Sequence, residues 1–286
     1  MKQVLVVNNP NAGRKKALKY KKAVLKYLFN KKLPFKSILI EELGNINIDE
    51  FDTIIAIGGD GTVNKLIPFI INTEKILGII PCGTANLLAA KLNIPANIHK
   101  ALKIIDNQNF SKIDTFKVNN KFSILRFGLG FDADIICNTP QSLKNKFGYL
   151  AYFIAGVLFS LRLKQRQYNL LYDNKKHSVV ATCLIAANAG NMFKNIFSVS
   201  KNCKLNDNLM DVFILKVKNP IMFFFEFLQI ILNIKISGSK AMYFQTSSLN
   251  IKNDFFNCHL DGEKHKFKDE INITIIPESV RVFSNI

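Results

Sequence analysis

Residues 53–64 have the sequence TIIAIGGDGTVN, and this stretch decides the fold. The apolar run over residues 53–57 is typical of a β-strand that is covered on both faces of its sheet. A turn of Gly58, Gly59, Asp60 and Gly61 follows, and residues 62–71 are predicted to form a helix. A buried strand, a glycine turn and a helix in this order form half of a βαβ unit, so the stretch predicts a parallel sheet with helices on it.

The same alternation of strand and helix extends over the first hundred residues. Further strands are expected at residues 3–7, 36–40 and 75–80, a helix at residues 14–29 and a short helix ending at residue 92. The helix at 14–29 carries its apolar side chains at helical spacing, at Ala17, Tyr20, Val24 and Leu28. Residues 1–111 are therefore predicted to be an α/β domain with a doubly wound parallel sheet.

The pattern changes after residue 112, where strand-like segments dominate and two apolar helices are interposed. The expected strands lie at residues 116–127, 168–172, 179–187, 210–217, 248–251 and 271–276. This order of elements predicts a second, mainly antiparallel and β-rich domain over residues 112–278.

The charge and the cysteine pattern indicate which kinds of binding partner and which cellular location to expect. The chain has 286 residues and a formal net charge of +18, which favours nucleic acid, an anionic membrane or phosphate-bearing substrates, although compositional bias contributes to the charge. Residues 14–36 contain ten basic residues and no acidic residue. This segment can be a solvated helix face or a surface that is attracted to anionic lipids. Five scattered cysteines argue against a disulfide framework and a zinc site, and the start of the chain lacks a signal-peptide pattern, so a cytoplasmic location is expected.

Two apolar stretches are too short to cross a bilayer. Residues 147–161 carry no charge but number only 15, and residues 220–234 are interrupted by Glu226. Each stretch is expected to be a buried helix. The first could instead lie on a membrane surface, because Arg162, Lys164 and Arg166 follow it directly.

The glycine turn after residue 57 is suited to binding phosphate. Glycines allow the backbone to approach a polyphosphate, and the N–H groups that open the next helix supply positive potential. Asp60 could contact a nucleotide or hold a metal ion, or it could simply cap a helix. Two further polar turns, at residues 9–13 and 83–86, also follow predicted strands, so all three should gather at one edge of the sheet. No Walker A pattern occurs in the chain.

Five motifs together resemble one family. The series NPNAG (9–13), GGDGTVN (58–64), PCGTAN (81–86), GLGFDAD (128–134) and HLDGE (259–263) is similar to the diacylglycerol kinase catalytic family, which includes soluble bacterial lipid kinases and the sphingosine and ceramide kinases. GGDGT alone is shared with NAD kinases. The resemblance runs from about residue 5 to the end of the chain and so covers nearly all of it.

The resemblance implies a nucleotide-binding domain, a β-sandwich-like domain, and ATP and lipid meeting in the cleft between them. It also implies that residues 279–286 rejoin the first domain, and that Glu263 is the catalytic base, aided by Asp60 and Asp261. The ATP contacts implied by the motifs are Asn9, Pro10, Asn11, Ala12, Gly13, Gly58, Gly59, Asp60, Gly61, Thr62, Val63, Asn64 and Thr84.

Two further sites follow from the resemblance. Asp134 matches a carboxylate that recognises the polar head of the lipid. A structural Mg²⁺ would be held by the Asp207 carboxylate and the backbone carbonyls of Lys204 and Leu209, with Asn208 in place of the usual glycine. The segment GLGFDA mimics a dinucleotide fingerprint, but no acidic residue follows at the spacing that would bind a ribose, so a Rossmann site is rejected.

The sequence therefore predicts a Mg-ATP-dependent lipid kinase that phosphorylates a hydroxyl of a membrane lipid, diacylglycerol or a related lipid alcohol. It is expected in the cytoplasm, peripherally associated with the inner face of the membrane, with a homodimer left open. Two alternatives are an NAD kinase-like phosphotransferase and a non-catalytic protein that binds lipid or nucleic acid.

Overall fold

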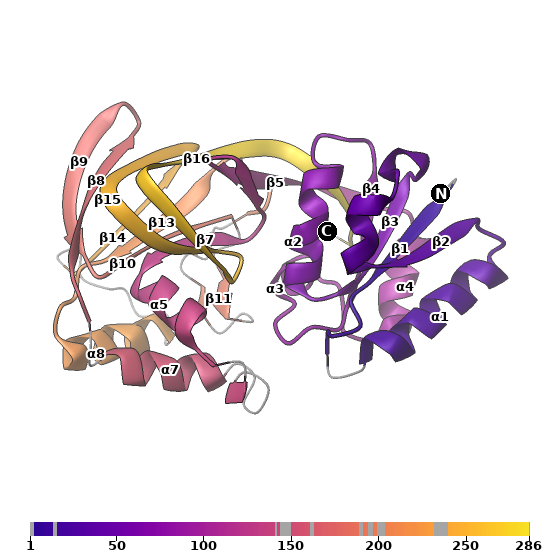
Figure 1. Cartoon of the computed structure of the whole chain (residues 1–286), viewed down its shortest axis with the longest axis horizontal. Coiled ribbons are helices and arrows are strands. Elements are labelled where there is room, and N and C mark those ends of the chain that lie inside the picture. Colours follow the sequence, from indigo (N-terminus) through magenta and orange to yellow (C-terminus); the bar gives the residue numbers. More distant parts are fainter. Residues whose placement is uncertain are drawn as a thin grey trace. The chain divides into compact units, whose positions relative to one another are not determined.

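A computed structural model describes residues 3–13, 16–140, 142–143, 150–160, 163–188, 191–193, 197–198, 204–231 and 240–285. The chain forms two compact units (Figure 1). The first comprises Met1–Asp114 and Pro277–Ile286, and the second comprises Thr115–Ile276. The sequence prediction placed these boundaries after residues 111 and 278.

The first unit is built on a parallel sheet. Its strands lie in the order β2 (Phe35–Leu39), β1 (Val4–Asn8), β3 (Thr53–Gly58) and β4 (Ile76–Pro81), and neighbouring strands pair in parallel. The end of β16 (Glu263–Phe283) adds to this sheet, because residues 281–282 pair in parallel with the start of β4. Every residue of β1 and β3 is buried, so the predicted doubly wound parallel sheet is confirmed.

Helices cover both faces of this sheet. α1 (Lys16–Asn30) and α4 (Ile98–Asp106) pack against each other on one face, and α2 (Asp60–Ile70) lies on the other (Figure 1). The connections β1–α1–β2 and β3–α2–β4 run outward in opposite directions, so right-handed crossovers place their helices on opposite faces. The short helices of this unit are α3 (Leu87–Lys91), η1 (Ile40–Asn45) and η2 (Ile48–Glu50).

The second unit is antiparallel, as predicted. One path of paired strands runs through β14 (Ala241–Thr246), β13 (Met210–Leu215), β10 (Cys183–Ala187), β7 (Arg126–Gly130), β15 (Ser248–Leu260) and β16. Further strands are β8 (Arg166–Tyr172), β9 (Lys175–Ala181), β5 (Phe110–Val118), which begins in the first unit, β6 (Lys121–Ser123), and the separate pair β11 (Asn191–Phe193) and β12 (Phe197–Ser198). The strands enclose a core that includes Phe116, Phe127, Tyr168, Leu184 and Ile251.

The predicted extents of several strands are wrong. The segment 116–127 is not one strand, because β5 ends at Val118 and a turn with Asn119 at a φ of 52° leads into β6 before β7 begins. The segment 179–187 is divided at Thr182, whose carbonyl accepts a hydrogen bond from the N–H of Phe131 (3.0 Å). Conversely, 248–251 and 271–276 are parts of the much longer β15 and β16. Apolar runs show that a segment is buried but do not show where its pairing changes.

Three helices of the second unit pack on one another: α5 (Phe131–Asn138), α7 (Leu150–Ser160) and α8 (Pro220–Ile231). α7 contacts both of the others, and Figure 1 shows the three along one side of this unit. Within the described part of the chain, no helix combines the length and apolar character needed to cross a bilayer.

Candidate phosphate-binding and catalytic site

The three polar turns of the first unit pack against one another at the carboxyl ends of β1, β3 and β4. Gly13 has a φ of 63°, and a Cβ added there would lie 1.8 Å from the carbonyl oxygen of Cys82. A Cβ added to Gly83 would lie 2.6 Å from the Cα of Gly59. Backbone therefore touches backbone at these glycines, which explains why the turns lack side chains there.

Asn9 joins the first turn to the second. Its Nδ2 donates to Oγ1 of the buried Thr62 (3.1 Å), and its Oδ1 accepts from the N–H of Asn11 (3.1 Å). The side chains of Asn9 and Thr62 bind each other and so link the first two turns, and the ATP contacts predicted for them stay predictions. Asn11, Gly61 and Thr84 are exposed and lie where a ligand can reach them.

Asp60 ties the second turn to the third. Its Oδ2 accepts from the N–H of Leu87 (3.0 Å) and its Oδ1 from the N–H of Leu88 (3.1 Å), so the carboxylate caps the start of α3. The side chain of Asn86 completes the third turn by bonding both the N–H and the carbonyl of Gly83 (2.9 Å each). The capping alternative considered for Asp60 is thus observed, although the capped helix is α3 and not its own helix. A metal or nucleotide contact for Asp60 stays a prediction.

Pro10, Ala12, Gly58, Val63 and Asn64 complete the set predicted to contact ATP. Gly58 and Val63 are buried, so only their backbone can contribute to a site, and Pro10 and Ala12 are half-buried. Asn64 differs, because its buried Oδ1 has no hydrogen-bond partner among the described residues. The predicted ATP contact of Asn64 stays a prediction.

In the second unit, Glu263 is presented by a tight hairpin. Leu260 pairs with Glu263, and the two residues between them, Asp261 and Gly262, have φ angles of 47° and 92°. Two consecutive positive φ angles between antiparallel strands define a type I′ turn, which Asp-Gly favours. This hairpin places an exposed Glu263 at the first position of β16.

The Asp261 carboxylate holds this hairpin to the segment before β7. Oδ1 accepts from the Ser123 hydroxyl (2.9 Å) and from the N–H groups of Leu125 (3.0 Å) and Arg126 (2.8 Å), while Oδ2 accepts from the N–H of Ile124 (2.8 Å). Burial raises the pKa of the Asp261 carboxyl, and these hydrogen bonds act in the opposite direction. Its observed contacts are those of a positioning residue, and the predicted catalytic role is untested.

Replacing Asp261 with asparagine should lower the free energy of unfolding by about 1–3 kcal/mol, because an amide NH₂ would face the Ile124 N–H and leave it unsatisfied. Urea denaturation followed by circular dichroism measures the loss. Asp269→Asn is the matched control, because Asp269 is exposed and its φ of 61° suits asparagine. Equal stability of the two variants would contradict the proposed anchoring.

Sequence reasoning missed a buried charged cluster in the same unit. Asp132 Oδ2 lies 2.6 Å from His259 Nε2, and Asp132 Oδ1 lies 3.4 Å from Arg126 Nη2. All three side chains are buried, and a Cβ added to Gly128 would lie 2.1 Å from Asp132 Oδ2. Burial raises the pKa of Asp132, but Arg126 and His259 outweigh it and hold that pKa below its ordinary value. The one clue in the sequence is that both motifs, GLGFDAD and HLDGE, contain a member of the cluster.

Asp134 lies half-buried in the first turn of α5. Burial raises its pKa, and the positive charges of Arg166, Lys164 and Lys264 partly offset this. Lys264 follows Glu263 directly, so the predicted head-group residue and the predicted base belong to one region of the second unit. β7, which precedes Asp134, pairs antiparallel with β10 and β15, which agrees with rejecting a Rossmann site.

The predicted Mg²⁺ ligands lie in a turn before β13. Asp207 Oδ1 accepts from the N–H of Leu209 (3.2 Å), Lys204 is exposed, and Asn208 has a φ of 63°, the conformation that the usual glycine would allow. The described residues contain no cluster of three or more His, Cys, Asp or Glu side chains suited to a metal. The turn therefore offers one carboxylate, and carbonyl oxygens would have to supply the remaining ligands.

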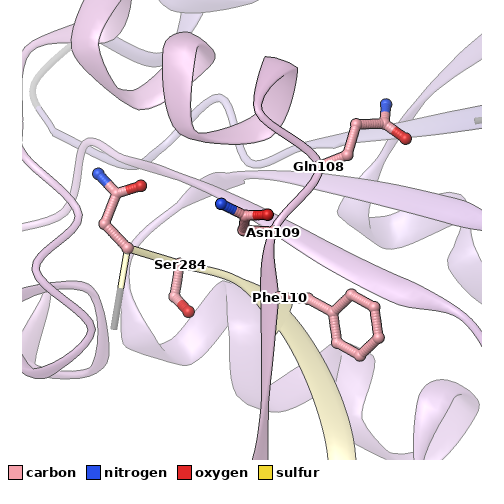
Figure 2. A pocket seen from close by; sticks show the side chains of 5 residues that line it. Gln108, Asn109, Phe110 and Ser284 are labelled. Atoms are coloured by element: carbon pink, nitrogen blue, oxygen red, sulfur yellow. The ribbon is translucent and has the colours of Figure 1, made fainter.

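A separate cavity of about 660 Å³ lies in the first unit, where α4 leads into β5 and the chain ends (Figure 2). It is lined by Gln108, Asn109, Phe110, Ser284 and Asn285. None of these is charged, and none belongs to the predicted site.

The predicted site residues thus form two groups. The nucleotide motifs meet at one sheet edge of the first unit, and Asp134, Asp261 and Glu263 belong to the second. The resemblance implies that ATP and lipid meet in a cleft between the two domains, and this implication stays a prediction.

Comparison with known proteins shows which proteins this chain is similar to. Residues 3–118 match the family model described as the diacylglycerol kinase catalytic domain. The chain is 26% identical to diacylglycerol kinase of Bacillus subtilis over 276 residues, covering 92% of this chain and 90% of that one. A Synechocystis sp. protein is 31% identical over 159 residues, which is 56% of this chain and 37% of that relative. A crystal structure from Bacillus anthracis str. Sterne has a TM-score of 0.83 at 22% identity, covering 99% of this chain and 97% of that one.

The two-unit fold, the packed glycine turns and the matched domain define a lipid kinase. Residues 3–118 match the catalytic domain of the diacylglycerol kinases, in agreement with the resemblance of the motifs, and over most of its length the chain is similar to the Bacillus subtilis enzyme.

Proposed function

We propose that the protein transfers the γ-phosphate of ATP to a hydroxyl of a membrane lipid, diacylglycerol or a related lipid alcohol. The observation that carries the proposal is the packing of the three glycine turns at one edge of the first unit, within the matched catalytic domain. Because the glycine turns pack so closely, no bulky side chains cover the surface beside the N–H groups at the start of α2. Such a surface, with N–H donors beside it, suits a polyphosphate. The match of residues 3–118 to the diacylglycerol kinase catalytic domain favours this function over an NAD kinase.

Glu263 is proposed to accept the proton of the lipid hydroxyl as its oxygen attacks the γ-phosphorus and ADP leaves. The type I′ turn holds Glu263 at the exposed start of β16, where a carboxylate can meet a substrate. Asp134, in the same region, is proposed to bind the polar head of the lipid.

Mg²⁺ bound with ATP would neutralise charge on the phosphates. A structural Mg²⁺ would be held by the Asp207 carboxylate with the carbonyls of Lys204 and Leu209. The oxygen-only donor set and the positive φ of Asn208, which permits the turn, both fit this hard cation.

Peripheral membrane association is proposed for the α7 and α8 face of the second unit. The buried Glu226 is paired with Lys240 (2.5 Å), so the charge within α8 does not reach its surface. Exposed apolar side chains on the two helices are Val157, Leu158, Ile221, Met222 and Phe225. Lys164 follows α7, and Lys218 precedes α8, so basic side chains flank this apolar face, as interfacial helices require.

Ile221→Ser should weaken binding to anionic vesicles about tenfold, because it removes an apolar side chain that is 68% exposed. Sedimentation with phosphatidylglycerol-containing vesicles measures the change. Val180→Ser is the matched control, since Val180 is 52% exposed on β9 of the same unit but outside these helices. Similar losses in both variants would show that the α7 and α8 face is not the docking surface.

The function is tested by incubating the purified chain with Mg²⁺, γ-labelled ATP and a total lipid extract, then identifying the labelled species. A labelled lipid phosphate is expected, with diacylglycerol as the first candidate acceptor. A parallel reaction with NAD⁺ should yield no labelled product. Label on NAD⁺ alone, or no labelled product in either reaction, would overturn the proposal.

A further inference from the structure

His259 lies directly beneath the turn that presents Glu263. It is the penultimate residue of β15, its side chain is completely buried, and its ring bridges two groups. Nε2 lies 2.6 Å from Asp132 Oδ2, and Nδ1 lies 3.4 Å from the backbone nitrogen of Gly262. One ring thus connects α5 to the tip of the hairpin.

The contacts define the direction of both hydrogen bonds. A backbone N–H can only donate, so Nδ1 must accept from Gly262 and carries no proton. The ring proton is then on Nε2, which donates to the Asp132 carboxylate. A doubly protonated ring would set an N–H against the Gly262 N–H and push the turn away.

The surroundings leave this bridge no freedom to shift. Gly128 lies against it so closely that an added Cβ would be 2.4 Å from His259 Nε2. Arg126 holds the other oxygen of Asp132, and the backbone of Arg126 also binds Asp261, the first residue of the turn. Both residues of the turn are therefore anchored to β7: Asp261 directly, and Gly262 through His259 and Asp132.

We propose that His259, through its bridge between Asp132 and Gly262, is a positioning residue that sets the orientation of Glu263 for proton transfer. The inference rests on the proposed function, in which Glu263 is the general base. His259 itself is buried and meets no substrate, so it acts only through the turn.

Two substitutions separate the two hydrogen bonds. In His259→Gln the terminal amide can still reach Asp132, but no acceptor remains for Gly262. In His259→Asn the side-chain oxygen takes the place of Nδ1 and can still accept from Gly262, but the bond to Asp132 is lost. We expect His259→Gln to lower kcat for lipid phosphorylation about tenfold or more, since small displacements of a reacting group cost up to about 100-fold. His259→Asn should lower kcat less, and KM for ATP should change in neither variant.

Stability separates positioning from a merely structural role. Urea denaturation gives the folded fraction of both variants, so that kcat can be expressed per folded molecule. We expect the loss of kcat per folded molecule to be larger in the glutamine variant than its loss of stability explains. Equal kcat per folded molecule in both variants and the wild type would overturn the proposal. If His259→Gln does not fold, Asp132→Asn provides the test, because it weakens the anchor and leaves the imidazole in place, and an unchanged kcat would again overturn it.

The Glu263→Gln background shows whether His259 acts through Glu263. We expect His259→Gln to cause no further loss there, and a further loss of tenfold would contradict the proposal. Failure of the proposed function is recognised separately. If Glu263→Gln keeps wild-type turnover, the base assignment fails, whereas an inactive Glu263→Gln with a fully active His259→Gln refutes the positioning role alone.

Discussion

Glu263→Gln should reduce ATP-dependent lipid phosphorylation by about 10²- to 10⁴-fold, the range that a positioned general base contributes. Glutamine has nearly the same shape as glutamate but cannot accept the hydroxyl proton. Glu263 is exposed and follows a turn held by other residues, so the free energy of unfolding should change by less than about 0.5 kcal/mol. Initial rates with labelled ATP and dispersed diacylglycerol measure the loss.

Glu270→Gln is the matched control, because it makes the same substitution on the same strand, β16. Glu270 contacts Asn250 and Lys252, both in β15, and it is not among the predicted site residues. Its turnover should stay near that of the wild type. If Glu263→Gln also keeps near-wild-type turnover, Glu263 has no part in the proton transfer.

The first unit could be predicted well because its signals are local. The strands β1, β3 and β4 are short apolar runs, each ending in a turn of glycine and polar residues, and the predicted bounds lie within one residue of those observed. The helix α1 buries Ala17, Val24 and Leu28, three of the four side chains expected on one face. Hydrophobic period and turn residues carry this information without knowledge of distant parts of the chain.

The contacts that organise the site in the second unit were not predictable in this way. His259 and Asp132 are 127 residues apart, and no local pattern pairs a buried histidine with a particular carboxylate. Asp261 was predicted to aid the catalytic base, but the four hydrogen bonds of its carboxylate go to Ser123–Arg126, far away in sequence. Asp60 likewise caps α3, 27 residues further on. Motif reading finds residues of the right type, and the fold decides which of them bind substrate and which hold the chain.

Gly58→Ala should destabilise the first unit by about 3 kcal/mol, although Gly58 has an ordinary negative φ. An added Cβ would lie 2.1 Å from Oγ1 and 2.4 Å from Cβ of Thr62. Thr62 is buried and receives the Asn9 Nδ2 hydrogen bond, so it cannot move aside without breaking the link between the first two turns. ATP binding should weaken with it, as titration calorimetry can measure.

Gly61→Ala provides the contrasting control within the same glycine-rich turn. No atom lies within 4 Å of a Cβ added there, and Gly61 is in the first turn of α2. Alanine in an unstrained helical position reduces the entropy of the unfolded chain and should raise the free energy of unfolding by about 0.4–1 kcal/mol. Urea denaturation should therefore move in opposite directions for the two variants. Equal shifts in the free energy of unfolding would mean that the close packing of Gly58 on Thr62 is not what requires glycine at position 58.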